Sequence, residues 1–424
     1  MAERSYTVIH DSVHGSVRMD DSFASILDSP ELQRMGHVHQ LGLANLVFPG
    51  ANHTRLEHML GTYHLASLFS ERLRIGGQEK DLLLAAALVH DAGHPPFSHT
   101  FEDVLRLRLG INHMELSARI IMGEMDTVPS DERYVLSGSR RICESLESMG
   151  LSPKEVAQLV MLEEGTESIP GYLTSLIHGP VDVDQLDYLM RDSHYTGVAQ
   201  GSVDAARIIE TSSLADGVMV VERRGMAAVE GLTVSRILMN SAVYFHRTVR
   251  IAEMMLAKAV SMLDRAAFVD VFRDTDASLS ERLKANGGYQ REVALRLKYR
   301  RLFKSSLQLN LERMSPDERK RITVLSAGNR LARMEDELSA LAGGEPGSVI
   351  IDIAPRDFLA RRRRKGKTEV PILDDDGKVR KLTSLSPIAR AVQMHPPQSW
   401  GLMVACDPAI RPQISRMAYD AIFG

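Results

Sequence analysis

The densest group of reactive side chains lies in the segment ALVHDAGHPPFSHTFED at residues 87–103, which contains three histidines and three acidic residues. Its His90-Asp91 pair follows the aliphatic run LLLAAALV at 82–89, so both side chains should lie at the edge of a buried core. Burying them without partners would cost several kcal/mol. A divalent cation removes that cost, because neutral imidazole and carboxylate both bind it, and neighbours about 100° apart on a helix can converge on one ion. The segment therefore predicts a metal site.

Two further segments supply the remaining ligands. In TRLEHMLG, Arg55 and His58 are three residues apart and share one helix face, which offers a guanidinium beside an imidazole. In VDVDQLDYLMRD, Asp184, Tyr188 and Asp192 follow at intervals of four, a stripe that suits a metal and a sugar. Any one of these histidines alone is more often a structural residue, but the ordered set favours a metal. The candidate ligands are His58, His90, Asp91 and Asp184.

Helices dominate the expected architecture. Apolar spacing and capping residues predict helices at 54–74, 79–92, 114–124, 153–164, 184–192, 203–213, 229–265, 278–285, 289–298, 329–341 and 410–422. Strands are expected at 218–222 and in a C-terminal series that includes an Asp-rich hairpin near 374–377. The sequence therefore predicts a mainly α fold, with a core at 1–344 and a small α+β lobe at 345–424.

Composition narrows the class of protein. With 424 residues, 44% hydrophobic and 25% charged, the chain reads as a soluble globular protein. Its two cysteines exclude a disulfide framework and a thiolate zinc cluster, and no apolar run is long enough for a membrane span, so we expect a cytoplasmic protein without a membrane partner. The net charge of −4 argues against a surface that binds nucleic acid throughout, although RRRRKGK at 361–367 is strongly basic.

The order His58, His90-Asp91, Asp184 resembles the HD-domain metal-dependent phosphohydrolases, and longer strings resemble their deoxynucleoside triphosphate triphosphohydrolase branch. These strings are DSVHGSVRM at 11–19, SPELQRM and HQLGLANLVFPGANHTRLEHMLG within 29–61, HDAGHPPFSHTFE at 90–102 and VDVDQLDYLMRDSHYTG at 181–197. The resemblance covers nearly the whole chain and implies an all-helical HD core. The SAM domain of a human family member is not expected, since residue 1 falls just before the core.

The resemblance implies a role for each matching position. The four candidate ligands would hold a transition metal, with iron or manganese preferred and zinc, nickel or cobalt compatible, while magnesium accompanies the nucleotide phosphates. His99 with Glu102 would handle the proton, and His94 and His113 would contact the α-phosphate region. The substrate-binding positions are Gln40, Leu41, Arg55, Tyr188, Asp192, Arg236 and Tyr244; of these, Arg55 and Arg236 would hold phosphates and the others would line a sugar pocket that has no room for a 2′-hydroxyl.

The implied activity is hydrolysis of dNTPs to deoxynucleoside and inorganic triphosphate, and with it a part in dNTP homeostasis. The resemblance also implies a homo-oligomer, dimer or tetramer, with a nucleotide effector between subunits. Two departures bear on this. Gln185 replaces a phosphate-binding lysine of the human member, so phosphate binding would be weaker or shared with an arginine such as Arg191. Asp11 matches a guanine pocket whose other positions hold Ser16 and Gly36, which argues against GTP activation in that form.

Two other functions remain open. The chain could act on nucleoside monophosphates or alarmones, which Gln185 favours, and such an enzyme would release orthophosphate or pyrophosphate. It could instead be a nucleic-acid or nucleotide-sensing module with a structural metal, which would bind single strands tightly without turnover.

Overall fold

Helices form the bulk of the computed structural model, which describes residues 5–130, 132–161, 169–354, 369–394 and 400–424. The helices of the first half are α1 (Asp21–Leu27), α2 (Pro30–Met35), α3 (Arg55–Leu73), α4 (Gly77–Val89), α5 (Glu102–Leu109), α6 (His113–Ile121), α7 (Ile142–Ser148), α8 (Pro153–Met161), α9 (Gly171–His178) and α10 (Val183–Thr196). Those of the second half are α11 (Ala205–Glu210), α12 (Met226–Met239), α13 (Arg247–Ser261), α14 (Arg265–Val269), α15 (Asp276–Asn286), α16 (Gly288–Lys298), α17 (Pro316–Leu325), α18 (Arg330–Leu341), α20 (Leu382–Leu385), α21 (Pro387–Met394) and α22 (Arg411–Phe423). The expected mainly α fold is confirmed.

Three small sheets accompany these helices. The strands are β1 (Tyr6–Asp11), β2 (Gly15–Asp20), β3 (Ser212–Ala215), β4 (Val218–Glu222), β5 (Lys304–Asn310), β6 (Val349–Ile353), β7 (Pro371–Leu373), β8 (Val379–Lys381) and β9 (Trp400–Cys406). They form a β1-β2 hairpin, a sheet in the order β3-β4-β7-β8, and a sheet in the order β5-β9-β6. The Asp-rich hairpin expected near 374–377 is the β7-β8 turn.

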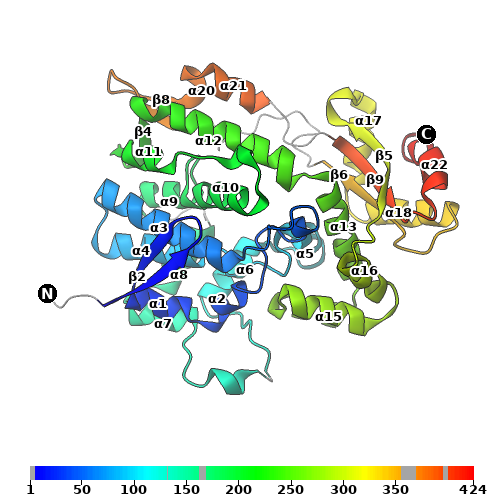
Figure 1. Cartoon of the computed structure of the whole chain (residues 1–424), viewed down its shortest axis with the longest axis horizontal. Coiled ribbons are helices and arrows are strands. Elements are labelled where there is room, and N and C mark those ends of the chain that lie inside the picture. Colours follow the sequence, from blue (N-terminus) through cyan, green and yellow to red (C-terminus); the bar gives the residue numbers. More distant parts are fainter. Residues whose placement is uncertain (1–4, 131, 162–168, 355–368, 395–399) are drawn as a thin grey trace.

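The last 80 residues do not pair only among themselves. Strand β7 runs parallel to β4, with Val221 opposite Ile372, while β9 lies between β5 and β6. Figure 1 shows β5, β6 and β9 beside α17, α18 and α22 on the right, and α20 and α21 over α12 at the top. Both sheets thus combine strands from before and after residue 345. The division of the chain at that residue stays a prediction about folding units.

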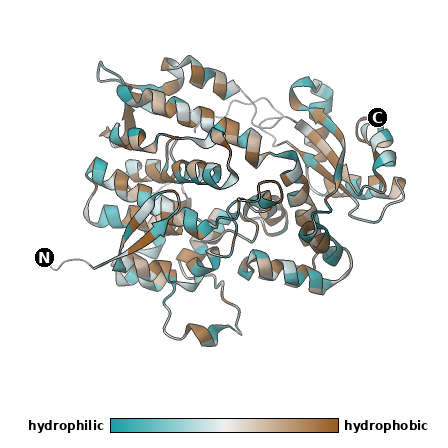
Figure 2. Cartoon of the chain, in the orientation of Figure 1, coloured by the Kyte–Doolittle hydropathy of each residue, from teal (hydrophilic) through white to brown (hydrophobic). Residues whose placement is uncertain are grey.

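The site rests on the largest hydrophobic core, which α3, α4, α8 and α10 share. Along α4, residues 77–79 are exposed, whereas every residue from Leu82 to Val89 is buried, so this second part of the helix has no polar face. Elsewhere apolar and polar residues alternate along the helices, as helices with one buried face require (Figure 2). No helix among the described residues is long and apolar enough to cross a membrane. The His90-Asp91 pair therefore lies directly after the fully buried part of α4.

One expected helix is wrong. The span 229–265 is not continuous, because α12 ends at Met239, a π-helical turn covers Asn240–Tyr244, and α13 begins at Arg247. Such π-turns recur at functional sites because they rotate the following side chains. Here the turn ends at Tyr244, one of the expected sugar-pocket residues. Apolar periodicity continues through the break, so periodicity alone could not locate it.

Candidate metal and phosphate site

Three segments bring the four candidate ligands together: α3 carries His58, the end of α4 leads into His90-Asp91, and α10 carries Asp184. The Nε2 atom of His58 lies 3.1 Å from Asp184 Oδ1 and 3.8 Å from Asp91 Oδ2, and His90 Nε2 lies 3.5 Å from Asp91 Oδ1 and 3.9 Å from Asp184 Oδ1. One ligand atom each from His58, His90 and Asp184 lies within 4.8 Å of the other two. This His/Asp cluster is capable of binding a divalent metal.

The hydrogen bonds of both imidazoles leave the correct nitrogen for a metal. His90 donates from Nδ1 to the carbonyl of Ala87 at 2.9 Å, and His58 donates from Nδ1 to Asp187 Oδ2 at 2.7 Å. Each ring then keeps a lone pair on Nε2, and these two buried atoms have no hydrogen-bond partner among the described residues. Two acceptors, His58 Nε2 and Asp184 Oδ1, face each other across 3.1 Å, which requires a proton or a cation between them. The donor set therefore fits a transition metal.

Charge at the site is also arranged for a cation. Burial would raise the pKa of Asp91, but Arg55, His90 and His94 outweigh it and hold the pKa well below its ordinary value. Burial likewise lowers the pKa of His58, but the hydrogen bonds to Asp184 and Asp187 raise it to about 10. Asp184 and Asp187 thus favour positive charge at His58, and a divalent cation at Nε2 would supply that charge in place of a proton.

Buried residues behind His58 orient this candidate ligand, in an arrangement that the sequence did not reveal. Asp187 accepts hydrogen bonds from His58, from His14 at 2.6 Å, and from Arg191 at 2.9 and 3.0 Å. Arg191 also donates to Asp11 Oδ2 at 2.8 Å, and its side chain is fully buried. Arg191 therefore has no exposed face for a phosphate, contrary to the expectation that it could share phosphate binding. The Asp11 carboxylate is equally occupied, because its Oδ1 accepts from the backbone of Val13 and His14.

Arg55 lies at the start of α3, where a capping box between Thr54 and Glu57 fixes the first turn. It hydrogen-bonds Asp91 Oδ2 through Nη1 and Ser98 Oγ through Nε, the latter at 2.8 Å. Its Nη2 is buried and has no hydrogen-bond partner among the described residues. Arg55 thus holds the candidate ligand Asp91 with one side of its guanidinium and keeps a donor for an oxygen of another group.

The loop between Asp91 and His99 is held from both sides. Arg34 donates to the carbonyls of Ala92 and His94, at 3.1 and 2.7 Å, while Asp276 accepts from the backbone of Phe97 at 2.7 Å. Gly93 packs so closely on α6 that an added Cβ would lie 2.1 Å from the backbone nitrogen of Ser117. These contacts fix the path on which His94 and His99 sit.

His94, His99 and His113 form a second group. The His94 ring stacks on His113 with centroids 4.1 Å apart, and His99 is edge-on to both at 4.9 and 5.6 Å. His94 is buried, His113 half-buried and His99 exposed. Burial, with Arg55 and His113, lowers the pKa of His94 well below its ordinary value. Glu102 begins α5, but its side chain lies outside the described residues, so its pairing with His99 stays a prediction.

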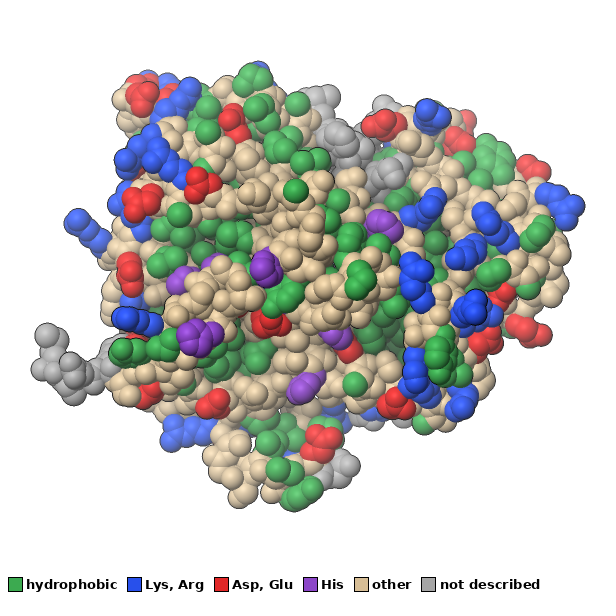
Figure 3. Space-filling view, in the orientation of Figure 1, with side chains coloured by type: hydrophobic (Ala, Val, Ile, Leu, Met, Phe, Trp, Pro, Cys, Tyr) green, Lys and Arg blue, Asp and Glu red, His purple; other side chains and the backbone are tan. Residues whose placement is uncertain are grey.

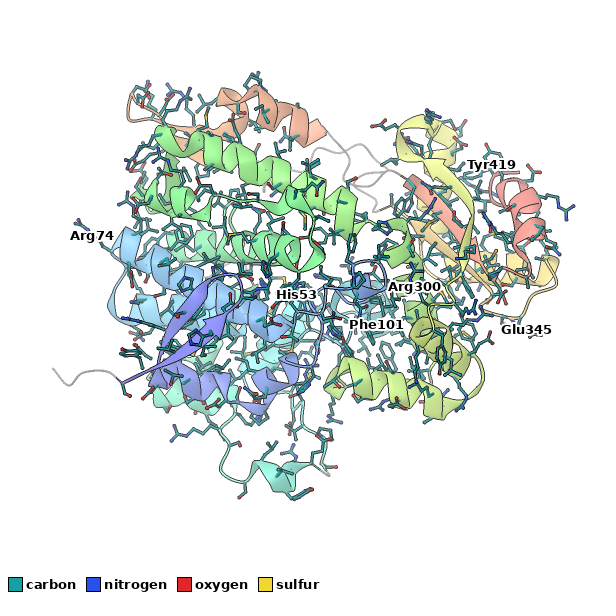
Figure 4. All side chains as sticks on the ribbon, viewed as in Figure 1. His53, Arg74, Phe101, Arg300, Glu345 and Tyr419 are labelled. Atoms are coloured by element: carbon teal, nitrogen blue, oxygen red, sulfur yellow. The ribbon has the colours of Figure 1, made fainter. Side chains whose placement is uncertain are left out.

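The expected sugar-pocket residues gather around Asp192. Its Oδ2 accepts from the hydroxyl of Tyr244 at 2.7 Å, and its Oδ1 lies 2.7 Å from Nε2 of buried His53, which the sequence did not single out. The Tyr188 ring lies 6.0 Å from that of Tyr244. Figure 4 places His53 near the middle of the molecule. The only sequence signal for His53 was its position in the string NHTRLEH, which also contains Arg55 and His58.

The other predicted binding residues lie at two places. Gln40 is buried, its backbone donates to the carbonyl of His53 at 3.0 Å, and its Oε1 has no hydrogen-bond partner among the described residues. Leu41 is half-buried beside it. Arg236 donates from Nη1 to Gln185 Oε1 at 2.7 Å, so the residue that replaces lysine orients an arginine instead. The basic stretch RRRRKGK lies outside the described residues.

Two family models match the chain: the HD domain at residues 55–163 and the HD associated region at 203–423. An uncharacterized protein of Methanocaldococcus jannaschii is 31% identical over 94% of this chain and 78% of its own length. The deoxynucleoside triphosphate triphosphohydrolase SAMHD1 homolog of Dictyostelium discoideum is 29% identical over 62% of this chain, and human deoxynucleoside triphosphate triphosphohydrolase SAMHD1 is 31% identical over 48%. The alignments cover only 51% and 35% of those two proteins.

Two solved structures share the fold over nearly the whole chain. A hypothetical protein from Aquifex aeolicus is 28% identical with a TM-score of 0.70, covering 97% of this chain and 99% of that one. A phosphohydrolase from Bacteroides thetaiotaomicron is 23% identical with a TM-score of 0.71, covering 95% of this chain and 100% of that one. At this identity the second likeness concerns the fold alone.

Proposed function

Since this chain belongs to the HD-domain phosphohydrolase family and carries its HD associated region, we propose that it hydrolyses deoxynucleoside triphosphates to deoxynucleoside and inorganic triphosphate. One observation carries the proposal. Two imidazoles present lone pairs on Nε2 toward Asp91 and Asp184, beside an arginine that keeps a buried donor. The relatives named as triphosphohydrolases support the choice of substrate.

His58, His90, Asp91 and Asp184 would hold the metal, for which iron or manganese suits the two imidazoles best. When bound, such a metal supplies a Lewis acid for the phosphoryl oxygens and lowers the pKa of water. Arg55, through its unpartnered Nη2, and Arg236, oriented by Gln185, bind the phosphates. A magnesium ion accompanies the phosphate chain. Charge on the triphosphate is thereby offset as it enters the site.

The remaining residues position the substrate and move its proton. His94 and His113 line the space next to the α-phosphate, and His99, exposed at its edge, gives a proton to the 5′-oxygen that leaves when water attacks the α-phosphorus. Asp192 accepts a hydrogen bond from a hydroxyl of the sugar, while His53 and Tyr244 hold the Asp192 carboxylate in place. Gln40, Leu41 and the rings of Tyr188 and Tyr244 pack around the sugar and exclude a 2′-hydroxyl.

The purified protein, incubated with Mn²⁺ and each dNTP, is expected to release inorganic triphosphate and deoxynucleoside, and to hydrolyse the matching ribonucleotides more slowly because the sugar pocket is closed. Product analysis by ion chromatography separates the alternatives. Orthophosphate or pyrophosphate as the product would instead favour an HD phosphohydrolase acting on monophosphates or alarmones. Tight binding of single-stranded nucleic acid with no turnover of any nucleotide would favour a sensing module.

We also propose an oligomer with a nucleotide effector site, and a basic cavity supports the effector site. A cavity of about 390 Å³ lies between α13 and β5, and four of the residues that line it are cations from separate segments: Arg247, Arg300, Lys304 and Arg411. Figure 3 shows Lys and Arg gathered on this part of the surface, and Figure 4 labels Arg300 there. No acidic residue is among those that line it, so the cavity suits a polyphosphate.

Added nucleoside triphosphates are expected to stimulate the wild type but not Lys304→Ala. The unstimulated rate of the variant should stay within about twofold of the wild type, because exposed Lys304 is not among the residues proposed to bind metal or substrate. Initial rates with and without a second nucleotide measure this. Exposed Lys320→Ala, which removes a cation on α17, serves as the control and should respond like the wild type. Equal stimulation of both variants would place any effector elsewhere.

A further inference from the structure

We propose that His94, His99 and His113 form a second transition-metal site, and that a zinc-class cation bound there inhibits the enzyme. One ring nitrogen from each of the three lies within 4.8 Å of the others. They come from the loop after Asp91, from the 3-10 turn Ser98–Phe101 and from the first residue of α6. A set of three imidazole donors binds Zn²⁺, Co²⁺ and Ni²⁺ in preference to Mg²⁺.

The buried nitrogen of His94 is the observation that points to a cation. Its Nε2 lies 3.2 Å from Asp91 Oδ1, and because a carboxylate oxygen only accepts, Nε2 carries the proton. The Nδ1 atom therefore keeps a lone pair, and it is buried without a hydrogen-bond partner among the described residues. Such an atom costs about 1–3 kcal/mol unless a donor or a cation meets it. A metal ion satisfies a lone pair directly.

The three histidines are already held near one another. The capping box of Asn112 and Glu115 fixes the first turn of α6, where His113 lies, with hydrogen bonds of 2.8 and 2.9 Å. Arg34 holds the carbonyl of His94. His99 is exposed and gives an ion a path from solvent. A metal would therefore bind with little rearrangement, apart from the side-chain rotations that complete its coordination.

The second site would adjoin the first. Asp91 Oδ1 lies 3.5 Å from His90 Nε2 and 3.2 Å from His94 Nε2, so one carboxylate stands between the two groups of histidines and screens two cations from each other. The second group also contains His99, the proposed proton donor. The inhibition, unlike the metal binding, rests on the proposed function. An imidazole that ligates an ion cannot deliver a proton from that nitrogen, and the ion occupies the space of the α-phosphate.

Metal counting tests the site without reference to activity. Purified protein is equilibrated with Co²⁺, freed of excess ion, and assayed by elemental analysis and visible absorption. The wild type is expected to hold two ions per chain, while His99→Ala and His113→Ala each hold one. His58→Ala, which alters only the first site, should also hold one, and exposed His37→Ala should hold two. Because His99 is exposed, His99→Ala keeps the fold even if His113→Ala does not.

Zinc titration then tests the consequence. Triphosphate release by the wild type is expected to rise as the first site fills and to be lost at excess Zn²⁺, with recovery when a chelator removes the second ion. If the wild type binds only one ion per chain, and His99→Ala and His113→Ala each still bind one, the second site does not exist. Two ions in the wild type and one in those variants, with no triphosphate from any dNTP, would uphold the site and refute the proposed function.

Discussion

His90→Ala is expected to lower kcat/KM for dNTP hydrolysis by at least roughly a thousandfold. A bound metal stabilises the transition state by several kcal/mol, and each tenfold loss of rate corresponds to about 1.4 kcal/mol of activation free energy. The imidazole offers its Nε2 lone pair and is held through Nδ1 by the carbonyl of Ala87. Its removal should release the metal. Steady-state rates and the metal content of the same preparation measure both effects.

The matched control is His37→Ala, which removes an exposed histidine outside both histidine groups and should change kcat/KM by less than about twofold. Treating the wild type with a chelator should reproduce the loss, and Mn²⁺ should restore activity to the wild type but not to His90→Ala. A His90→Ala protein that holds its metal and works at the wild-type rate would show that the ion lies elsewhere.

Arg191→Leu is expected to lower the free energy of unfolding by about 3–5 kcal/mol, the cost of removing one partner from a buried ion pair. Arg191 is fully buried and lies between Asp11 and Asp187, with hydrogen bonds of 2.8 to 3.0 Å. Without it, two buried carboxylates keep their charge and lose their principal counterion. Urea unfolding, followed by circular dichroism, measures the change.

Arg224→Leu provides the comparison, since its guanidinium also pairs with a carboxylate, Glu222, at 2.6 Å but is exposed. Exposed pairs contribute about 0–1 kcal/mol, so this variant should unfold close to the wild type. Arg191→Leu should also bind metal more weakly, because Asp187 holds His58, a ligand of the proposed metal. If both variants unfold at the same urea concentration, the buried network contributes little to stability.

Much of the fold followed from local patterns. The apolar spacing at 54–74 and the apolar run before His90 predicted α3 and α4 to within a few residues, because a buried helix face repeats over each helical turn. The break between α12 and α13 did not follow, since the π-turn at Asn240–Tyr244 interrupts the backbone without interrupting the apolar pattern. The local hairpin β1-β2 was also missed, and so was strand β5, whose partner β9 lies about 100 residues further along the chain and is set by tertiary packing.

For the site, residue type and helical spacing determined which side chains share a face: Arg55 with His58, and Asp184 with Tyr188 and Asp192. Only the tertiary structure decided whether those faces meet. It also decided that Asp187, Arg191 and His53 are the buried partners. The physical reason is distance along the chain. The tautomer of His58 depends on a carboxylate 129 positions away, and the orientation of Asp192 on a histidine 139 positions away, contacts that no local pattern encodes.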